Sequence, residues 1–203
     1  MTNRIITISR EFGSGGHTIG KLVSERLGIA FYDKELVRQV AEKSGYSSDF
    51  VEEHGEYAPT TSSFLFNLAF SANWSKMTDG LSPADQLYIL QNNIIRELAD
   101  EGPCVIVGRC ANYVLKERDD VLNVFIYASK EARAKRIVEK YGDNGVKPET
   151  RVKKKDEQRR VYYKHYTGEE WGDAKNYHIS LDSERLGIET CAQVIAEIFS
   201  KAR

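Results

Sequence analysis

The sequence predicts one α/β domain, residues 1–203, in which a five-stranded parallel sheet lies between layers of helices. Two observations predict this fold. Five short apolar runs resemble strands buried on both faces, and segments with helical periodicity separate them along the chain. Strands that alternate with helices favour a parallel sheet with both faces covered. The length of 203 residues is within the range of a single domain.

The expected strands are residues 5–9, 30–32, 104–107, 123–128 and 177–181. The expected helices are about 16–27, 34–43, 83–100, 130–140, 148–164 and 188–202. Residues 44–81 contain no convincing strand, and we interpret them as a helical insertion. Its apolar stretch SSFLFNLAFSANW, from Ser62 to Trp74, would be apolar around nearly its whole circumference if helical. That stretch either packs on its own domain or forms a homodimer interface.

A charged, tyrosine-rich segment near the C-terminus, KPETRVKKKDEQRRVYYKHYTGEEW, breaks the sandwich pattern. It resembles a mobile cover more than a core helix, and we place a helical lid at about residues 141–172. A helix with one solvated face is the alternative interpretation.

Charge and composition argue against several classes of protein. The formal net charge of −1 provides no global field for nucleic acid or an anionic membrane. No apolar run approaches the roughly 20 residues that span a bilayer, and the N-terminus lacks the features of a signal peptide. The three cysteines are odd in number and lack metal-ligand spacing. We therefore expect a reduced, cytoplasmic protein that binds neither nucleic acid nor membrane.

A glycine-rich loop follows the first predicted strand and precedes an amphipathic helix. The first N–H groups of a helix carry partial positive charge and bind phosphate oxygens. Glycines in such a loop adopt positive φ and let the backbone approach an anion closely. A tight turn without a ligand is the alternative. We predict phosphate binding by Gly13, Ser14, Gly15, Gly16, His17 and Thr18.

The motifs and their order resemble those of the cytidylate kinase-like family of nucleoside-monophosphate kinases. SREFGSGGHTIG runs in register with the family's P-loop GPSGAGKGT, and AFYDKEL with a second strand that ends in LLDSG. VIVGRC resembles the third strand with its GRD motif, and DEQRR resembles the lid motif. NYHISLDSERLGIETCAQVI resembles the last strand and helix. The resemblance implies a P-loop NTPase-like three-layer sandwich, ATP and Mg²⁺ as cofactors, and a small nucleotide or phosphate ligand as partner.

The same register shows four departures from the family pattern. Gly16 stands where the P-loop has its lysine, and Val107 where the third strand ends in an aspartate. The GRD motif keeps Arg109, but its aspartate is Cys110. An acceptor-binding arginine falls at Gln39, with Arg38 one place away. The resemblance thus implies an anion site without the electrostatics usual for a kinase.

Other cations are expected to replace the missing lysine, because phosphoryl transfer depends on stabilising charge at the transferring group. Arg10 enters the loop and is the favoured surrogate, with His17 as a hydrogen-bond donor to the same phosphates. A salt-bridged surface role is the alternative for Arg10. The candidate catalytic residues are Arg10, Arg136, Arg159 and Asp156, and Arg133 is a further phosphate-binding candidate. An exposed helix-stabilising pair is the alternative for Asp156.

The candidate acceptor-binding residues are Asp33, Arg38 and Arg109. Asp33 ends the second strand at the carboxyl edge of the sheet, where α/β sheets bind ligands, although a helix N-cap role fits it nearly as well. The sequence identifies no metal ligands. The leading hypothesis is a kinase that transfers the γ-phosphoryl group of ATP to a nucleoside monophosphate or another small acceptor. A nucleotide- or phosphate-binding protein with little or no catalysis is the second hypothesis, and a structural protein the third.

Overall fold

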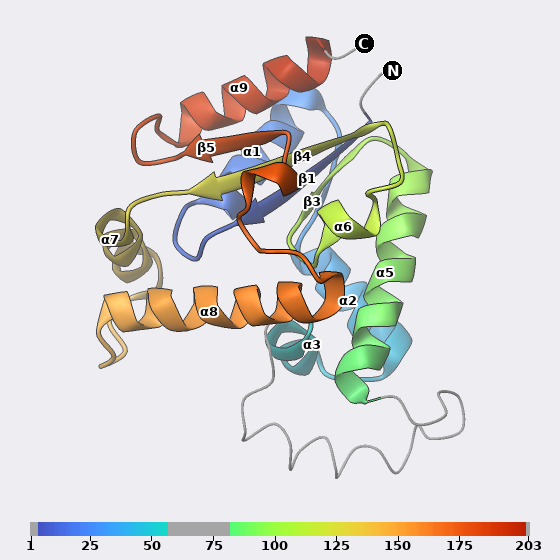
Figure 1. Cartoon of the computed structure of the whole chain (residues 1–203), viewed down its shortest axis with the longest axis horizontal. Coiled ribbons are helices and arrows are strands. Elements are labelled where there is room, and N and C mark those ends of the chain that lie inside the picture. Colours follow the sequence, from blue (N-terminus) through green and yellow to red (C-terminus); the bar gives the residue numbers. More distant parts are fainter. Residues whose placement is uncertain (1–3, 57–81, 202–203) are drawn as a thin grey trace.

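The computed structural model describes residues 4–56 and 82–201 of the chain, and its centre is one parallel β-sheet (Figure 1). The strands lie in the order β2-β3-β1-β4-β5, and each neighbouring pair is parallel. The central strand β1 (Ile5–Arg10) pairs with β3 (Cys104–Val107) and β4 (Val121–Tyr127). The edge strands are β2 (Ala30–Tyr32) and β5 (Ile179–Asp182). The predicted α/β fold with a five-stranded parallel sheet is confirmed.

The predicted helices form with bounds close to those expected from periodicity. They are α1 (Gly16–Leu27), α2 (Lys34–Ser44), α5 (Pro83–Glu101), α7 (Lys130–Tyr141), α8 (Pro148–Thr167) and α9 (Ile188–Lys201). Two short helices, α3 (Ser48–His54) and α6 (Ala111–Val114), were not predicted individually. The last strand begins two residues later than expected, because a 3-10 turn at Ala174–Asn176 precedes it.

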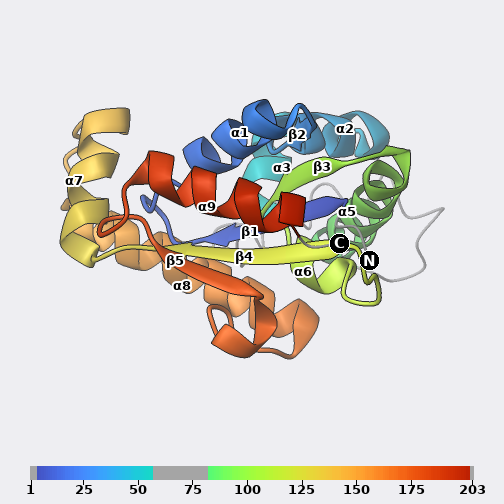
Figure 2. The ribbon, with the colours of Figure 1, turned by 90° about the horizontal axis from the view of Figure 1, so that it is seen from above.

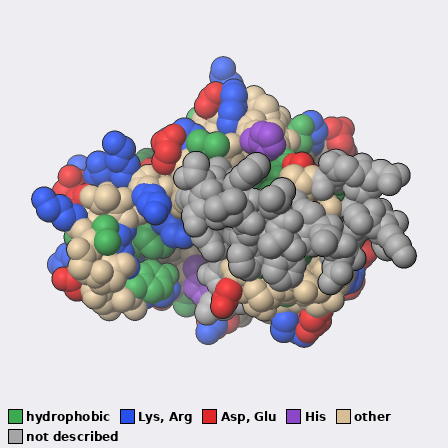
Figure 3. All heavy atoms as spheres, turned by 90° about the horizontal axis from the view of Figure 1, so that it is seen from below, with side chains coloured by type: hydrophobic (Ala, Val, Ile, Leu, Met, Phe, Trp, Pro, Cys, Tyr) green, Lys and Arg blue, Asp and Glu red, His purple; other side chains and the backbone are tan. Residues whose placement is uncertain are grey.

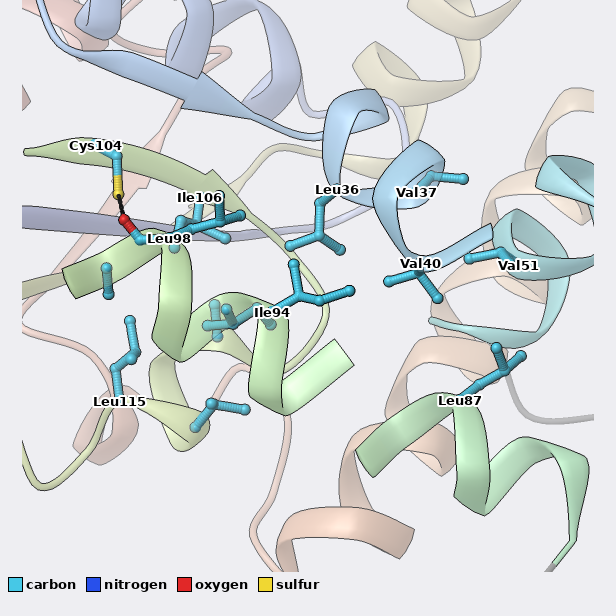
Figure 4. Close-up of a cluster of buried hydrophobic side chains, with 14 of the residues drawn as sticks. Leu36, Val37, Val40, Val51, Leu87, Ile94, Leu98, Cys104, Ile106 and Leu115 are labelled. Carbon is cyan, nitrogen blue, oxygen red and sulfur yellow. Dashed lines mark hydrogen bonds between the residues drawn. The ribbon is translucent and has the colours of Figure 1, made fainter. Parts of the chain in front are cut away.

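Alternate residues of the strands build two cores, one on each face of the sheet. Ile6 and Ile8 pack with the apolar faces of α1 and α9, whereas Ile5 packs with α2, α3 and α5 on the other face. Figure 4 shows side chains of this second core, among them Leu36 of α2, Val51 of α3 and Leu87 of α5. The picture also shows the Sγ atom of Cys104 directed at the carbonyl oxygen of Leu98, 3.9 Å away. Burial raises the pKa of Cys104 to about 12, so this thiol serves packing and not nucleophilic chemistry.

The α8 helix lies on the side of the sheet opposite α9, below the strands in Figure 1 and behind them in Figure 2. Its buried side chains include Tyr162 and Tyr163, which cluster with Cys110 at the start of α6. One face of α8 is thus packed on the domain while the other is solvated, and the lid at about residues 141–172 stays a prediction. The expected dimer segment, residues 62–74, lies outside the described residues.

Lys and Arg side chains gather over the end of the molecule that carries α7 and the start of α8 (Figure 3). Exposed Lys153 and Lys154 of α8 belong to this surface. Among the described residues, no helix combines the length and apolar character needed to cross a bilayer. The basic surface is local, since the net charge of the whole chain is −1.

Candidate active site

A cavity of about 500 Å³ opens at the carboxyl edge of the sheet, between the glycine loop and helices α2, α7 and α8. Its volume is within the range of small-molecule sites. Parallel α/β sheets bind ligands at this edge because the loops after the strands converge there. The lining includes these residues predicted from sequence: Arg10, Gly13, Gly15, Gly16, His17, Thr18, Asp33, Arg38, Arg109, Arg136 and Arg159.

The glycine loop has a left-handed backbone at Gly13 (φ 82°) and Gly15 (φ 86°), and α1 begins at the next residue. A Cβ on Gly13 would lie 2.8 Å from the carbonyl oxygen of Arg133, and one on Gly15 would collide with Ile188. The two glycines therefore permit positive φ and also close packing against α7 and the start of α9. As a result, the N-terminus of α1 faces the cavity.

Ser14 differs from the other loop residues because it faces the protein interior. Its Oγ donates to the carbonyl oxygen of Glu11 at 2.8 Å, and its own carbonyl accepts a hydrogen bond from Ser183 at 2.6 Å. It is fully buried and does not line the cavity. Its position indicates that it fixes the loop, in contrast to the sequence-based expectation of direct phosphate contact.

The side chain of Arg10 occupies the space beside Gly16. A Cβ on Gly16 would lie 2.5 Å from the Cβ and 2.8 Å from the Cγ of Arg10. Real Cβ contacts are never this short, so the loop cannot hold both the arginine and a side chain at position 16. This packing explains why a glycine stands at position 16, where the family has its lysine. The positive charge near the loop comes from Arg10 instead.

Glu56 lies among three arginines, and we call Glu56, Arg10, Arg109 and Arg159 the Glu56 cluster. Arg10 forms a short ion pair with Oε1, and Nη2 of Arg159 donates to Oε2 at 3.3 Å. The backbone N–H of Arg109 donates to Oε1 at 3.4 Å. Burial alone would raise the pKa of Glu56, but Arg10, Arg159 and Arg109 together hold this pKa well below its ordinary value. The carboxylate is therefore ionised at neutral pH.

Arg109 is the middle residue of a turn with left-handed backbone. The φ angle is 76° at Gly108, 58° at Arg109 and 55° at Cys110. Non-glycine residues adopt this region rarely and at some cost, and such positions cluster at functional sites. The Arg109 guanidinium donates to the carbonyl oxygen of Val51 at 3.0 Å and to Gln91 at 3.2 Å. These bonds fix the predicted acceptor-binding arginine against α3 and α5.

Asp33 and His17 form a hydrogen-bonded pair in the cavity wall, with Nδ1 of His17 2.5 Å from Oδ2 of Asp33. Burial of Asp33 opposes ionisation, but the hydrogen bond from His17 and the charge of Arg10 lower its pKa overall. Asp33 also stands at the N-cap position of α2, yet its side chain makes no capping bond. The alternative expectation from the sequence, an N-cap role, is thus correct about where Asp33 lies but not about what its side chain does.

A second set of charged residues lies behind the glycine loop, and we call Asp156, Glu11 and Arg133 the Asp156 cluster. Asp156 accepts hydrogen bonds from Arg133 at 2.5 Å and from the backbone N–H of Phe12 at 2.8 Å. Arg133 also donates to the carbonyl oxygens of Ala128 and Phe12 and lies 3.2 Å from Glu11. Asp156 and Arg133 do not line the cavity. Asp156 is buried and pairs with Arg133 of another helix, so the alternative interpretation as an exposed helix-stabilising pair is wrong.

Two further predicted arginines reach the cavity from its rim. Nη1 of Arg136 donates to the carbonyl oxygen of Gly13 at 2.7 Å, which places this guanidinium at the glycine loop. Arg38 is exposed and paired with Glu35 and Glu42 on the surface of α2. Arg136 is therefore held at the loop, and Arg38 is available to the cavity only from its solvated side.

The sequence profile of the cytidylate kinase-like family matches residues 5–185. The chain belongs to this family. A cytidylate kinase from Archaeoglobus fulgidus is 32% identical over 166 residues, which cover 80% of this chain and 76% of that protein. A cytidylate kinase from Pyrococcus horikoshii is 25% identical and covers 91% of this chain and 82% of its own length.

Solved structures support the same fold. An uncharacterized protein from Eubacterium ventriosum has 31% identity and a TM-score of 0.72, with 98% of each chain covered. The shikimate kinase from Acinetobacter baumannii, with 16% identity and a TM-score of 0.57 over 100% of this chain and 97% of its own, shows the fold alone. Membership of the cytidylate kinase-like family supports a kinase-like function.

Glu56 and Glu11 were absent from the sequence-based site. Glu56 lies 46 residues from Arg10 and 103 from Arg159, within the stretch interpreted as an insertion, and no family motif marks it. Glu11 lies inside the matched glycine-loop region and could have been identified as an acidic departure beside Arg10. Both carboxylates line the cavity.

The cavity lining offers two oxygen-bearing side chains for a magnesium ion bound together with phosphates. Within residues 4–56 and 82–201, no group of three or more His, Cys, Asp or Glu side chains could hold a metal ion. Mg²⁺ usually keeps several waters and binds through one or two protein oxygens together with substrate phosphates. The Thr18 hydroxyl and the Asp33 carboxylate, both in the cavity lining, fit that requirement.

Proposed function

We propose that the protein is a P-loop phosphotransferase that moves the γ-phosphoryl group of ATP, with Mg²⁺, onto a nucleoside monophosphate or another small acceptor. The observation that carries this proposal lies in the glycine loop. There the Cβ and Cγ atoms of Arg10 fill the space that a side chain at position 16 would need. A cation is thereby kept beside the N-terminus of α1, where a phosphate would be bound.

The donor phosphates would lie along the glycine loop, between α1 and the arginines of the cavity. Gly13, Gly15 and Gly16 leave the loop backbone accessible, and His17 and Thr18 add side-chain donors in the same lining. Arg10 would stabilise charge on the transferring group from β1, and Arg136 and Arg159 would do so from α7 and α8. When bound, magnesium would supply further positive charge, held by Thr18 and Asp33 with the phosphates.

The acceptor would lie at the side of the cavity formed by β2, α2 and the end of β3. Arg109 and Arg38 offer guanidinium groups there, and Asp33 offers a carboxylate held by His17. The proposal leaves the acceptor open, because the cytosine-reading aspartate of the family pattern corresponds to Cys110, which is buried. Ser14, Arg133 and Asp156 would act indirectly, by fixing the loop and α8.

The test is ATP consumption by the purified protein across a panel of nucleoside monophosphates and small hydroxylated metabolites. We expect one acceptor class to stimulate consumption well above the rate with ATP alone. Binding of ATP without turnover on the whole panel would reject the phosphotransferase in favour of the second candidate, a nucleotide-binding protein with little catalysis. The neutralisation of Arg10 by Glu56 is the observation that favours that candidate.

A further inference from the structure

Helix α7 contributes two cations to the lining of the large cavity, Arg136 and Lys140. They are four residues apart and therefore lie on the same face of the helix. The helix follows the end of β4 and lies next to the glycine loop (Figure 1), where Arg136 donates to the carbonyl oxygen of Gly13. Both residues thus border the space in which the proposed function puts the phosphates of the donor.

Lys140 differs from the other cations of the cavity lining in its contacts. Each of the others contacts a protein oxygen, and they are Arg10, His17, Arg38, Arg109, Arg136 and Arg159. Within residues 4–56 and 82–201, the exposed side chain of Lys140 has neither a hydrogen bond nor an ion pair. Its ammonium group instead lies 5.7 Å from the centre of the Tyr141 ring. All three N–H donors of this ammonium group are therefore available to a ligand.

The contact with Tyr141 keeps the Lys140 ammonium group near the glycine loop. The ring of Tyr141 stacks on the ring of Phe12, with 6.1 Å between the centroids and 13° between the planes. Phe12 directly precedes Gly13, and all of these residues line the cavity. A cation–π contact with a ring that is 57% exposed is weak. It therefore positions the ammonium group without preventing it from moving to a ligand.

The glycine loop itself supplies no ammonium group, because Gly16 stands at the position of the family's lysine. Arg10 fills the space beside Gly16, but its guanidinium is held in an ion pair with Glu56. A lysine is a compact charge on a flexible four-carbon stem, and its three donors rotate freely. Lys140 can therefore adjust to the position of a phosphate in a way that a fixed guanidinium cannot.

We propose that Lys140 binds the terminal phosphate of the donor nucleotide and so supplies, from α7, the lysine contact that position 16 cannot make. Arg136 contacts the same chain of phosphates from the preceding turn of the helix. The inference rests on the proposed function for the identity of the ligand, a nucleoside triphosphate. The opposite view is a structural role, because a lysine in the last turn stabilises the C-terminal end of α7 by its charge.

Calorimetric titration of Lys140→Ala with ATP and with ADP separates the two roles. We expect the Kd for ATP to rise about tenfold, as is typical when a hydrogen bond to a charged group is lost, and the Kd for ADP to change less. Lys135→Ala is the matched control, since Lys135 is an exposed lysine of the same helix that does not line the cavity. An equal Kd for ATP in the two variants, or an equal rise for ATP and ADP, would overturn the proposal.

A second substitution separates the charge of Lys140 from its packing on Tyr141. Lys140→Met keeps most of the apolar stem and removes the ammonium group, and because the residue is exposed, the change leaves the core of the domain intact. We expect Lys140→Met to weaken ATP binding as much as Lys140→Ala does. Wild-type affinity in Lys140→Met would show that packing and not charge accounts for the effect, which rejects the proposal.

Inorganic tripolyphosphate separates a failure of this inference from a failure of the proposed function. ATP consumption by the wild-type protein, with the same Kd for ATP in Lys140→Ala as in Lys135→Ala, rejects the inference and leaves the proposed function standing. A wild-type protein that consumes no ATP, but loses tripolyphosphate affinity in Lys140→Ala alone, rejects the phosphotransferase and keeps Lys140 as a phosphate-binding residue. Binding of neither ATP nor tripolyphosphate by the wild-type protein would overturn both.

Discussion

The Glu56 cluster and the Asp156 cluster are both built from buried carboxylates and arginines near the glycine loop, but they differ in their access to the cavity. Two carboxylates share Arg133 in the Asp156 cluster, and its hydrogen bonds end on protein groups such as the N–H of Phe12. In the other cluster Glu56 contacts Arg10, Arg159 and the backbone N–H of Arg109, and all of these residues line the cavity. The comparison teaches that access to the cavity, more than burial or pairing, distinguishes arginines that a ligand can reach from an arginine that only holds the fold.

Arg133→Ala should have the largest effect, and it should be on stability. Removing one partner of a buried ion pair leaves an uncompensated charge, which costs about 4 kcal/mol of unfolding free energy. Urea denaturation measures this loss. Arg160→Ala breaks an exposed ion pair within α8, between Arg160 and Glu157, and should cost about 0.5 kcal/mol or less. Equal losses in the two variants would remove the distinction between the Asp156 cluster and the solvated surface.

Arg10→Ala should lower phosphoryl transfer about a hundredfold, because it removes the cation beside the phosphate site. Single-turnover assays with the acceptor found in the panel measure the rate, and circular dichroism checks that the variant folds. Arg160→Ala is again the matched control and should keep the wild-type rate. A wild-type rate in Arg10→Ala would eliminate its surrogate role.

Glu56→Gln should reduce stability by about 2 kcal/mol at pH 7, since the arginines lose their anion but remain open to solvent from the cavity. The pKa of Glu56 is lowered in the folded protein, so its ionised form stabilises the fold at a pH above its ordinary value of 4.5. That contribution is lost gradually as the pH falls below 4.5. Thermal unfolding of both proteins should therefore show a difference that narrows in acid. A difference independent of pH would contradict the ionised cluster.

Asp33→Asn should have the smallest effect, a loss of about tenfold in phosphoryl transfer. The substitution weakens the bond that orients His17, and residues that orient a ligand-binding group typically contribute this much. Binding of ATP should change less than the rate. A loss of transfer rate as large as that of Arg10→Ala would show that Asp33 contributes as much to phosphoryl transfer as Arg10 does, which contradicts this prediction.

The fold was predictable because its signals are local. The run that forms β1 and the alternation of helices and strands both follow from patterns of a few residues, so their bounds agree within a few positions. The fourth strand begins at Val121 instead of residue 123, because Val121 and Leu122, which are apolar and buried, already pair with Ile5 and Ile6 of β1.

The balance of charges in the site was not predictable, because it depends on contacts between distant segments. Arg136 was expected to be catalytic and Arg133 to bind phosphate, yet Arg133 contacts Asp156 and Arg136 contacts the carbonyl oxygen of Gly13. Glu56 lies in a stretch without a motif, and nothing in the sequence relates it to Arg159. The motifs located the arginines but not their partners.

The packing of Arg10 against Gly16 restricts how this loop can change by mutation. In the family motif GPSGAGKGT the first glycine corresponds to Arg10 and the lysine to Gly16, so the two residue types have exchanged ends of the loop. Gly16→Lys alone would place a Cβ 2.5 Å from that of Arg10, and Arg10→Gly alone would remove the cation. We therefore expect each single step back toward the common motif to be harmful, whereas the double exchange would remove the clash and keep a cation in the loop. The effects of the two substitutions would then depend on each other, as is usual for residues in contact.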